Sequence, residues 1–172
     1  FMLDEETIPE TTSTTHLGVN RNKKNTVDIA SKIATGRKTA YALLGAGLHG
    51  RSGMKQDIKG HIWRTFITPR LIYGLETLLC TKTDLKKLET FQTKCLKQIQ
   101  HLPDRSATSA SQSLLGIMPI EDAVNKNYLN LLYRTLQNPD SVEFAVAERQ
   151  LATKSIDDRS IFSKIRKLLL QY

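Results

Sequence analysis

The chain has few of the residues that act as covalent, metal-binding or aromatic anchors. It holds two cysteines and one tryptophan in 172 residues, and its aromatic fraction is 6%. Cys80 and Cys95 belong to no close Cys/His pair, which argues against a zinc module and against a disulfide-stabilised secreted domain. We therefore expect two free, buried thiols in a protein that resides in a reducing compartment.

Long apolar runs and catalytic motifs are also missing. The longest apolar candidate, LIYGLETLLC, is interrupted by Gly74 and Glu76, so no membrane-spanning segment is predicted. The acidic N-terminus is unlike a signal peptide, and we expect an intracellular protein, nuclear or cytoplasmic, with no membrane partner. There is no G-x-S-x-G turn, and no G-K-[ST] follows the glycine-rich loop GAGLHGRSG. A complete small enzyme is therefore not expected.

Positive charge is abundant and unevenly placed. The net charge is +8. Residues 1–15 carry four acidic residues and no base, whereas residues 16–105 carry 17 basic against 6 acidic residues, and residues 106–172 carry 8 against 7. A concentrated cationic middle attracts a polyanion far better than the same charge spread evenly. Nucleic acid is the first candidate for that polyanion and an anionic membrane surface the second.

Hydrophobic periodicity predicts a mainly α fold, an irregular bundle of six or seven helices after a short N-terminal strand or loop remnant. A short strand is expected at residues 16–19, closed by a basic turn at residues 20–25. Thr26 and Thr83 are the expected N-caps of the first and third helices, and Pro69 is expected to split the second helix near Thr68. Further helices are expected before Leu114, from Ile120, from Asp140 or Ser141, and from Asp158.

Two helices, at residues 52–76 and 83–103, carry an apolar stripe and a cationic flank each. In the first, the stripe expected to face the core is Met54, Ile58, Ile62 and Phe66. Its opposite flank is Lys55, Lys59 and Trp63, followed by Arg70. In the second, the inward stripe is Leu85, Leu88, Cys95, Ile99 and Leu102, interrupted by Gln92, and the cationic side is Lys86, Lys94 and Lys97. Each helix should thus bury one face and present its cations.

The order of several short motifs resembles the region after the palm of non-LTR (LINE-type) retrotransposon reverse transcriptases. These motifs are His-Leu-Gly-Val at residues 16–19, Thr-Pro-Arg-Leu-Ile-Tyr-Gly-Leu-Glu at 68–76, Leu-Glu-Thr-Phe-Gln at 88–92 and Leu-Gly-Ile-Met-Pro-Ile at 115–120. The resemblance covers roughly residues 16–137. It implies that residues 1–25 are an acidic tail and the end of the palm, residues 26–103 a thumb-like helical domain, and residues 104–172 a helical connector.

The resemblance also implies a function, namely to grip an RNA–DNA or DNA template–primer duplex for the palm and fingers of the same polypeptide. The turn at Leu17 and Gly18 would be the primer-grip element. The catalytic aspartates, and with them Mg²⁺, would lie upstream of Phe1, so the segment alone should be inactive and hold no cofactor. Asp157 and Asp158 do not match the family's aromatic-x-Asp-Asp motif. The implied nucleic-acid contacts are Leu17, Gly18, Arg37, Arg51, Lys55, Lys59, Trp63, Arg70, Lys86, Lys94 and Lys97.

Alternatives remain at three points. Trp63 could stack on the nucleic acid, although burial in the core is the favoured interpretation for a lone large aromatic. Arg37, set inside an apolar stripe, could lie along the surface or reach into a ligand groove. The whole chain could instead be a helical protein–protein interaction module, and an exposed apolar patch on residues 161–170 would favour that function.

Overall fold

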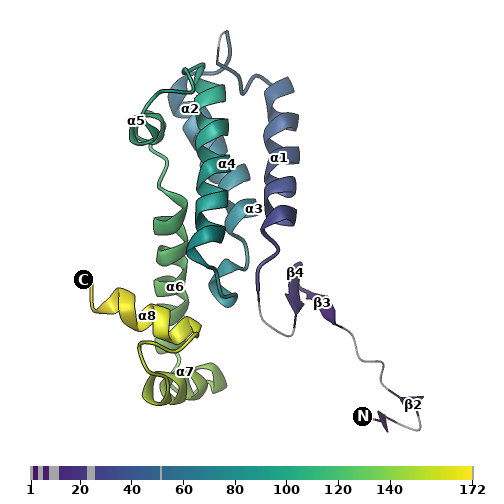
Figure 1. The fold of residues 1–172 in the computed structure, drawn as a ribbon, viewed down its shortest axis with the longest axis vertical. Helices are drawn as coiled ribbons and strands as arrows, with labels where there is room; N and C mark the ends of the chain where they lie inside the picture. The colour runs from purple at the N-terminus through teal and green to yellow at the C-terminus, as the bar shows by residue number, and fades with distance from the viewer. Residues whose placement is uncertain (1, 4–5, 8–11, 23–25, 51, 172) are drawn as a thin grey trace.

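Helices dominate the structure, a computed structural model that describes residues 2–3, 6–7, 12–22, 26–50 and 52–171 (Figure 1). The α-helices are α1 (Ile29–Gly45), α2 (Gln56–Ile62), α3 (Thr68–Ile72), α4 (Lys82–Gln100), α5 (Thr108–Ser113), α6 (Ile120–Leu136), α7 (Val142–Thr153) and α8 (Ile161–Leu169). A π-helical turn, η1 (Trp63–Ile67), joins α2 to α3 without a break, and a 3-10 turn, η2 (Leu75–Thr77), follows. Counting residues 56–72 as one rod, the described part holds seven helices, which confirms the predicted fold class.

The N-terminal strands form two small antiparallel pairs, β1 (Met2–Leu3) with β2 (Glu6–Thr7) and β3 (Ser13–His16) with β4 (Val19–Asn22). Leu17 and Gly18 are the two-residue turn between β3 and β4, with φ angles of 50° and 73°. Positive φ at both turn positions matches the twist of the flanking strands. The predicted strand at residues 16–19 is therefore wrong: its centre is the turn, and the expected turn residues Asn20–Asn22 belong to a strand.

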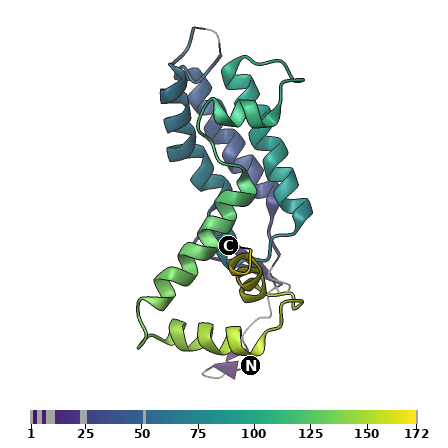
Figure 2. The same ribbon diagram turned by 90° about the vertical axis from the view of Figure 1, so that its left-hand side faces the viewer.

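Three rods run side by side along the long axis of the molecule. Figures 1 and 2 show α1, the α2–η1–α3 rod and α4 packed together at one end, with α5 beside the far end of α4. Helix α6 leaves this bundle and runs to the other end, where it contacts α7 and α8. The guanidinium of Arg166 on α8 donates to the carbonyls of Leu151 and Lys154, which ties α8 to the end of α7.

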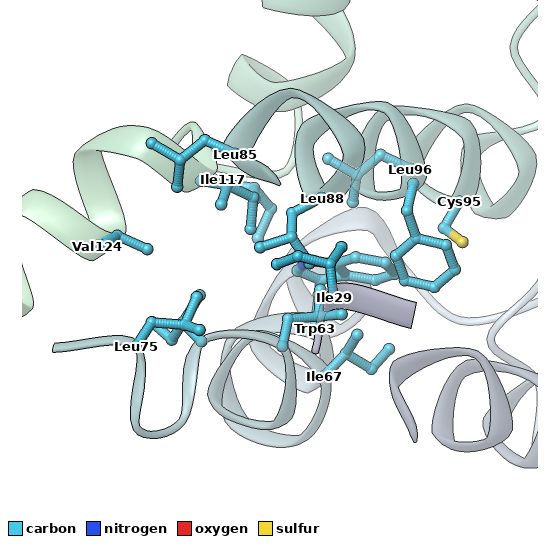
Figure 3. Packing of buried hydrophobic residues seen from close by; sticks show 14 of the residues in the cluster. Ile29, Trp63, Ile67, Leu75, Leu85, Leu88, Cys95, Leu96, Ile117 and Val124 are labelled. Atoms are coloured by element: carbon cyan, nitrogen blue, oxygen red, sulfur yellow. The ribbon is translucent and has the colours of Figure 1, made fainter. Parts of the chain in front are cut away.

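The core lies between the rods and confirms the predicted inward stripe of α4. Leu85, Leu88, Cys95 and Ile99 are all buried, and Leu102 is half-buried. Figure 3 shows Trp63 among them, beside Leu88, Leu96 and Ile67. The predicted junction near Thr68 is also confirmed, because α3 begins at Thr68 with Pro69 in its first turn, directly after the π-helical turn.

The inward face predicted for the α2–η1–α3 rod is wrong. Ile58 and Phe66 are 44% and 49% exposed, whereas Lys59, Trp63 and Ile67 are buried. Two causes act together. Tryptophan has the largest apolar surface to bury, and glycine at position 60 lets the α2 backbone approach the carbonyl of Leu115, where a Cβ atom would lie 2.3 Å from the oxygen.

Helix boundaries differ from prediction where a neighbouring polar residue makes the better cap. Asp28, not Thr26, caps α1, and its side chain accepts from Ser31 N. Helix α4 is capped by Thr81, two residues before the predicted Thr83 cap, and helix α8 is capped by Ser160 rather than opened by Asp158. The helices from Ile120 and after Ser141, and the short helix α5, lie where predicted. On the last helix Ile165 and Leu168 are buried, whereas Leu169 is 53% exposed.

Candidate nucleic-acid interface

The outward face of α4 carries the densest set of cations in the candidate site. The helix starts from a capping box in which Thr81 Oγ1 accepts from Asp84 N at 3.2 Å and Asp84 Oδ2 accepts from Thr81 N at 3.0 Å. This fixes the first turn. Because the apolar stripe faces the core, Lys82, Lys86 and Lys94 project to solvent.

Two grooves flank this face. We call the larger, of about 1070 Å³, the α4–α6 groove; it is lined by α4 residues, the segment after α4 and the start of α6. We call the smaller, of about 440 Å³, the α1–α4 groove. Lys86, Thr90 and Lys94 line both grooves and form the ridge between them.

The linings of the two grooves are net positive. Six cations line them: Arg37, Lys82, Lys86, Lys87, Lys94 and Lys97. Three acids line them: Glu89, Asp104 and Glu121. The Glu89 carboxylate is engaged internally, accepting from Ile120 N at 2.7 Å and from the Gln112 side-chain amide. The exposed ridge therefore offers ammonium groups to a polyanion with little local competition.

Four of the predicted contact residues meet in these grooves, namely Arg37, Lys86, Lys94 and Lys97. Arg37 is exposed on α1 and lines the α1–α4 groove. Of the two positions considered from the sequence, along the surface or in a groove, the structure has Arg37 in a groove. Lys97 is half-buried, and its Nζ donates to the Asp104 carbonyl at 2.6 Å, so part of its hydrogen-bonding capacity is used within the protein.

Lys59 and Trp63 do not belong to any surface. Lys59 is 2% exposed and Trp63 is fully buried, so the predicted surface position of both is wrong and the core interpretation of Trp63 is confirmed. Trp63 Nε1 donates to Gln92 Oε1 at 3.3 Å, and Gln92 Nε2 donates to the Met118 carbonyl at 3.0 Å. The glutamine that interrupts the α4 stripe is thus a buried connector between η1, α4 and the entrance to α6.

The other predicted contacts lie away from the ridge. Arg70 donates to Thr39 Oγ1 and lines a different hollow, between α1 and η1. Lys55 is exposed at the N-terminus of α2 and lines neither α4 groove. Leu17 is 77% exposed at the hairpin tip with Gly18, and its carbonyl accepts from Tyr73 Oη at 2.9 Å. Arg51 falls outside the described residues.

Sequence reasoning missed Lys82 and Lys87 as groove residues. Lys82 precedes Lys86 by four residues, the spacing that places side chains on one helical face. The signal was present in the sequence but was lost because the helix was expected to start at Thr83, one residue after Lys82. The capping box at Thr81 and Asp84 was the feature that would have corrected the boundary.

A second polar cluster lies where α4, α6 and α8 meet. Tyr128 Oη donates to the Leu78 carbonyl at 3.0 Å, and burial raises the pKa of this phenol. Lys164 Nζ lies 4.9 Å from the centre of the Tyr128 ring, and burial lowers the pKa of that amine.

Cys80 and Cys95 are both free thiols. Cys95 is buried, and burial raises its pKa to about 11, whereas Cys80 is half-buried.

The described ranges hold no candidate metal site and no candidate membrane-spanning helix. No group of three or more His, Cys, Asp or Glu side chains there could hold a metal ion. Among the helices of residues 26–50 and 52–171, none is both long and apolar enough to cross a bilayer. Comparison of the chain with protein-family models, with curated proteins and with solved structures gave no match.

Proposed function

We propose that this chain binds a nucleic-acid duplex along α4, as the thumb and connector of a non-LTR reverse transcriptase. The observation that carries the proposal is the ridge of Lys86, Thr90 and Lys94 with a net-positive groove on each side. Lysine and arginine contacts to phosphate position a duplex without reading its sequence, which is the property a thumb requires.

The dimensions of the ridge suit a phosphate backbone. From Lys82 to Lys97, α4 extends by fifteen residues, or roughly 22 Å at about 1.5 Å per residue. Phosphates of one strand follow each other about every 3.4 Å along the helix axis, so the stretch of α4 from Lys82 to Lys97 spans roughly six or seven of them. Lys82 and Lys86 lie about one helical turn apart, and Lys86 and Lys94 about two turns apart, so each can meet a separate phosphate of one strand.

Contacts among the motif residues support the suggested parentage. The Leu17 carbonyl of the first motif accepts from Tyr73 of the second. Gln92, in the third motif, donates to the carbonyl of Met118 in the fourth, and Glu89 accepts from Ile120 N. These motifs therefore join the hairpin, the split rod, α4 and α6 into one scaffold that presents the ridge. In this proposal the palm of the same polypeptide would supply the catalytic aspartates and Mg²⁺.

The test is duplex binding by the whole chain, measured by fluorescence anisotropy with a labelled RNA–DNA duplex at low salt. Lys86→Gln with Lys94→Gln removes both shared ridge lysines. The matched control, Lys126→Gln with Arg149→Gln, removes the same charge from exposed helical positions outside the grooves. We expect the ridge variant to bind about tenfold or more weakly, and the control to stay close to the unmodified chain. Equal affinity of the two variants would contradict the proposal.

One observation favours a second candidate, a protein–protein interaction module. Leu169 and Leu170 are 53% and 71% exposed at the end of α8. Exposed neighbouring leucines are typical of a helix that docks on a partner. If the unmodified chain bound no duplex at low salt, while Leu169→Ser with Leu170→Ser changed its sedimentation behaviour, this second function would be favoured.

A further inference from the structure

A further hollow of about 330 Å³ lies where the start of α4, the start of α6 and the α8 region converge. Four cations line it: Lys82, Arg159, Lys164 and Lys167. The acids in its lining are Glu121 and Asp158. Asp158 Oδ2 accepts from Ser155 N at 2.9 Å, so it is engaged in its own turn. We call this hollow the α8 pocket.

The fold holds Lys164, the one half-buried cation of the pocket lining, in a defined position. Lys164 is half-buried over the ring of Tyr128, whose hydroxyl is in turn held by the Leu78 carbonyl. Ser160 Oγ accepts from Ser163 N and so fixes the first turn of α8. Lys164 lies at the end of this turn, and Lys167 lies three residues later in the last turn of the same helix. Arg159 and Lys167 remain exposed at the rim.

The α8 pocket is continuous with the α4–α6 groove. Lys82, Leu85 and Glu121 line both. An anionic chain lying in the groove and leaving it at Lys82 therefore enters the pocket next. The region beyond residue 138 carries little net charge, yet three of its six basic residues, Arg159, Lys164 and Lys167, line this one opening.

We propose that the α8 pocket binds a backbone phosphate of the same nucleic acid that occupies the α4–α6 groove, so that the C-terminal helices extend the binding track. This inference rests on the proposed function. A phosphate oxygen would be met by the ammonium of Lys164 inside and by the charges of Arg159 and Lys167 at the rim, with charge-assisted hydrogen bonds as the source of affinity.

The experiment compares three double variants of the whole chain in the duplex-binding assay across a salt series. Arg159→Gln with Lys167→Gln removes the rim cations, both exposed and therefore of little cost to folding. Lys126→Gln with Arg149→Gln is the matched charge control, and Lys86→Gln with Lys94→Gln reports on the ridge. We expect the rim variant to bind about threefold or more weakly and to lower the log–log salt slope by about one to two.

The outcomes separate the two proposals. If the rim and control variants have equal affinity and equal salt slope, the α8 pocket is overturned. If the ridge variant binds more weakly in the same series, the proposal for the ridge still stands. Absence of duplex binding by the unmodified chain would overturn both. Weakening of the rim variant alone would place duplex binding at the pocket and not on the ridge, and it would overturn both the ridge and the binding track proposed here.

Cys80 gives an independent readout because it is half-buried in the pocket lining. Bound duplex should slow alkylation of this thiol in the unmodified chain, and the protection should shrink in the rim variant. Alkylation at the same rate with and without saturating duplex would count against the pocket.

Discussion

At the scale of single residues, one buried amide explains how the split rod is oriented. Trp63 can be buried only if its indole N–H finds an acceptor, since an unpaired polar group in a core costs about 1–3 kcal/mol. Gln92 supplies the acceptor and uses its own amide hydrogen on the Met118 carbonyl. A polar residue inside an apolar stripe is thus a structural connector and not an interruption.

Replacing Gln92 by leucine should destabilise the protein by about 1–3 kcal/mol, because Trp63 Nε1 and the Met118 carbonyl would both lose a partner. The matched control is Gln98→Leu on the exposed side of the same helix, expected within about 0.5 kcal/mol of the unmodified chain. Urea unfolding with a common m-value measures the difference. Equal midpoints for the two variants would show that the buried amide contributes nothing.

At the scale of elements, the predicted inward face was confirmed for α4 and was wrong for the rod from α2 to α3. The difference has a physical reason. Helix α4 has a single apolar stripe, so only one face could be buried. The rod from α2 to α3 has apolar residues on more than one side, with Phe66 and Trp63 on different faces. Local pattern could not choose between these faces. The choice depended on the close approach at Gly60 and on the acceptor that α4 provides for Trp63.

The sequence predicted Thr83 as the N-cap of α4, whereas the structure has Thr81 in that position. Two alanine variants can tell these caps apart. Thr81→Ala removes the acceptor of Asp84 N and should cost about 0.5–2 kcal/mol of stability. Thr83→Ala lies one residue before Asp84 in the same first turn, and its side chain is exposed. We expect that change to be nearly neutral. Thermal and denaturant unfolding of both variants provide the measurement. A larger loss of stability in Thr83→Ala would show that Thr83, and not Thr81, caps the helix.

At the scale of the whole molecule, positive charge follows one continuous path. It begins in the α1–α4 groove, crosses the ridge of Lys86 and Lys94, and passes through the α4–α6 groove to Lys82 and the α8 pocket. Other cations predicted as contacts are turned elsewhere: Arg70 lies against Thr39, and Lys59 is buried. The path is narrower than the sequence suggested, and it extends further toward the C-terminus.

The salt dependence of duplex binding should report the number of cations along that path. If all six groove cations meet phosphates, the log–log slope should be about −5, at roughly −0.9 for each contact. Removing Lys86 and Lys94 should bring the slope to about −4 or less in magnitude. Titration of labelled duplex from low to moderate salt gives the value. A slope near zero would mean that phosphate neutralisation does not drive binding.

Several features of this protein followed from sequence alone because they depend on neighbours along the chain. The helical class, the inward stripe of α4, the junction near Thr68 and the cationic middle are all local patterns of period, charge or backbone restriction. The face that the split rod buries, the role of Gln92 and the gathering of Lys82, Lys164 and Lys167 at one opening were decided only by tertiary packing. Each depends on contacts between residues that are far apart in the sequence. The local pattern of one helix does not say which residues of another helix will lie against it.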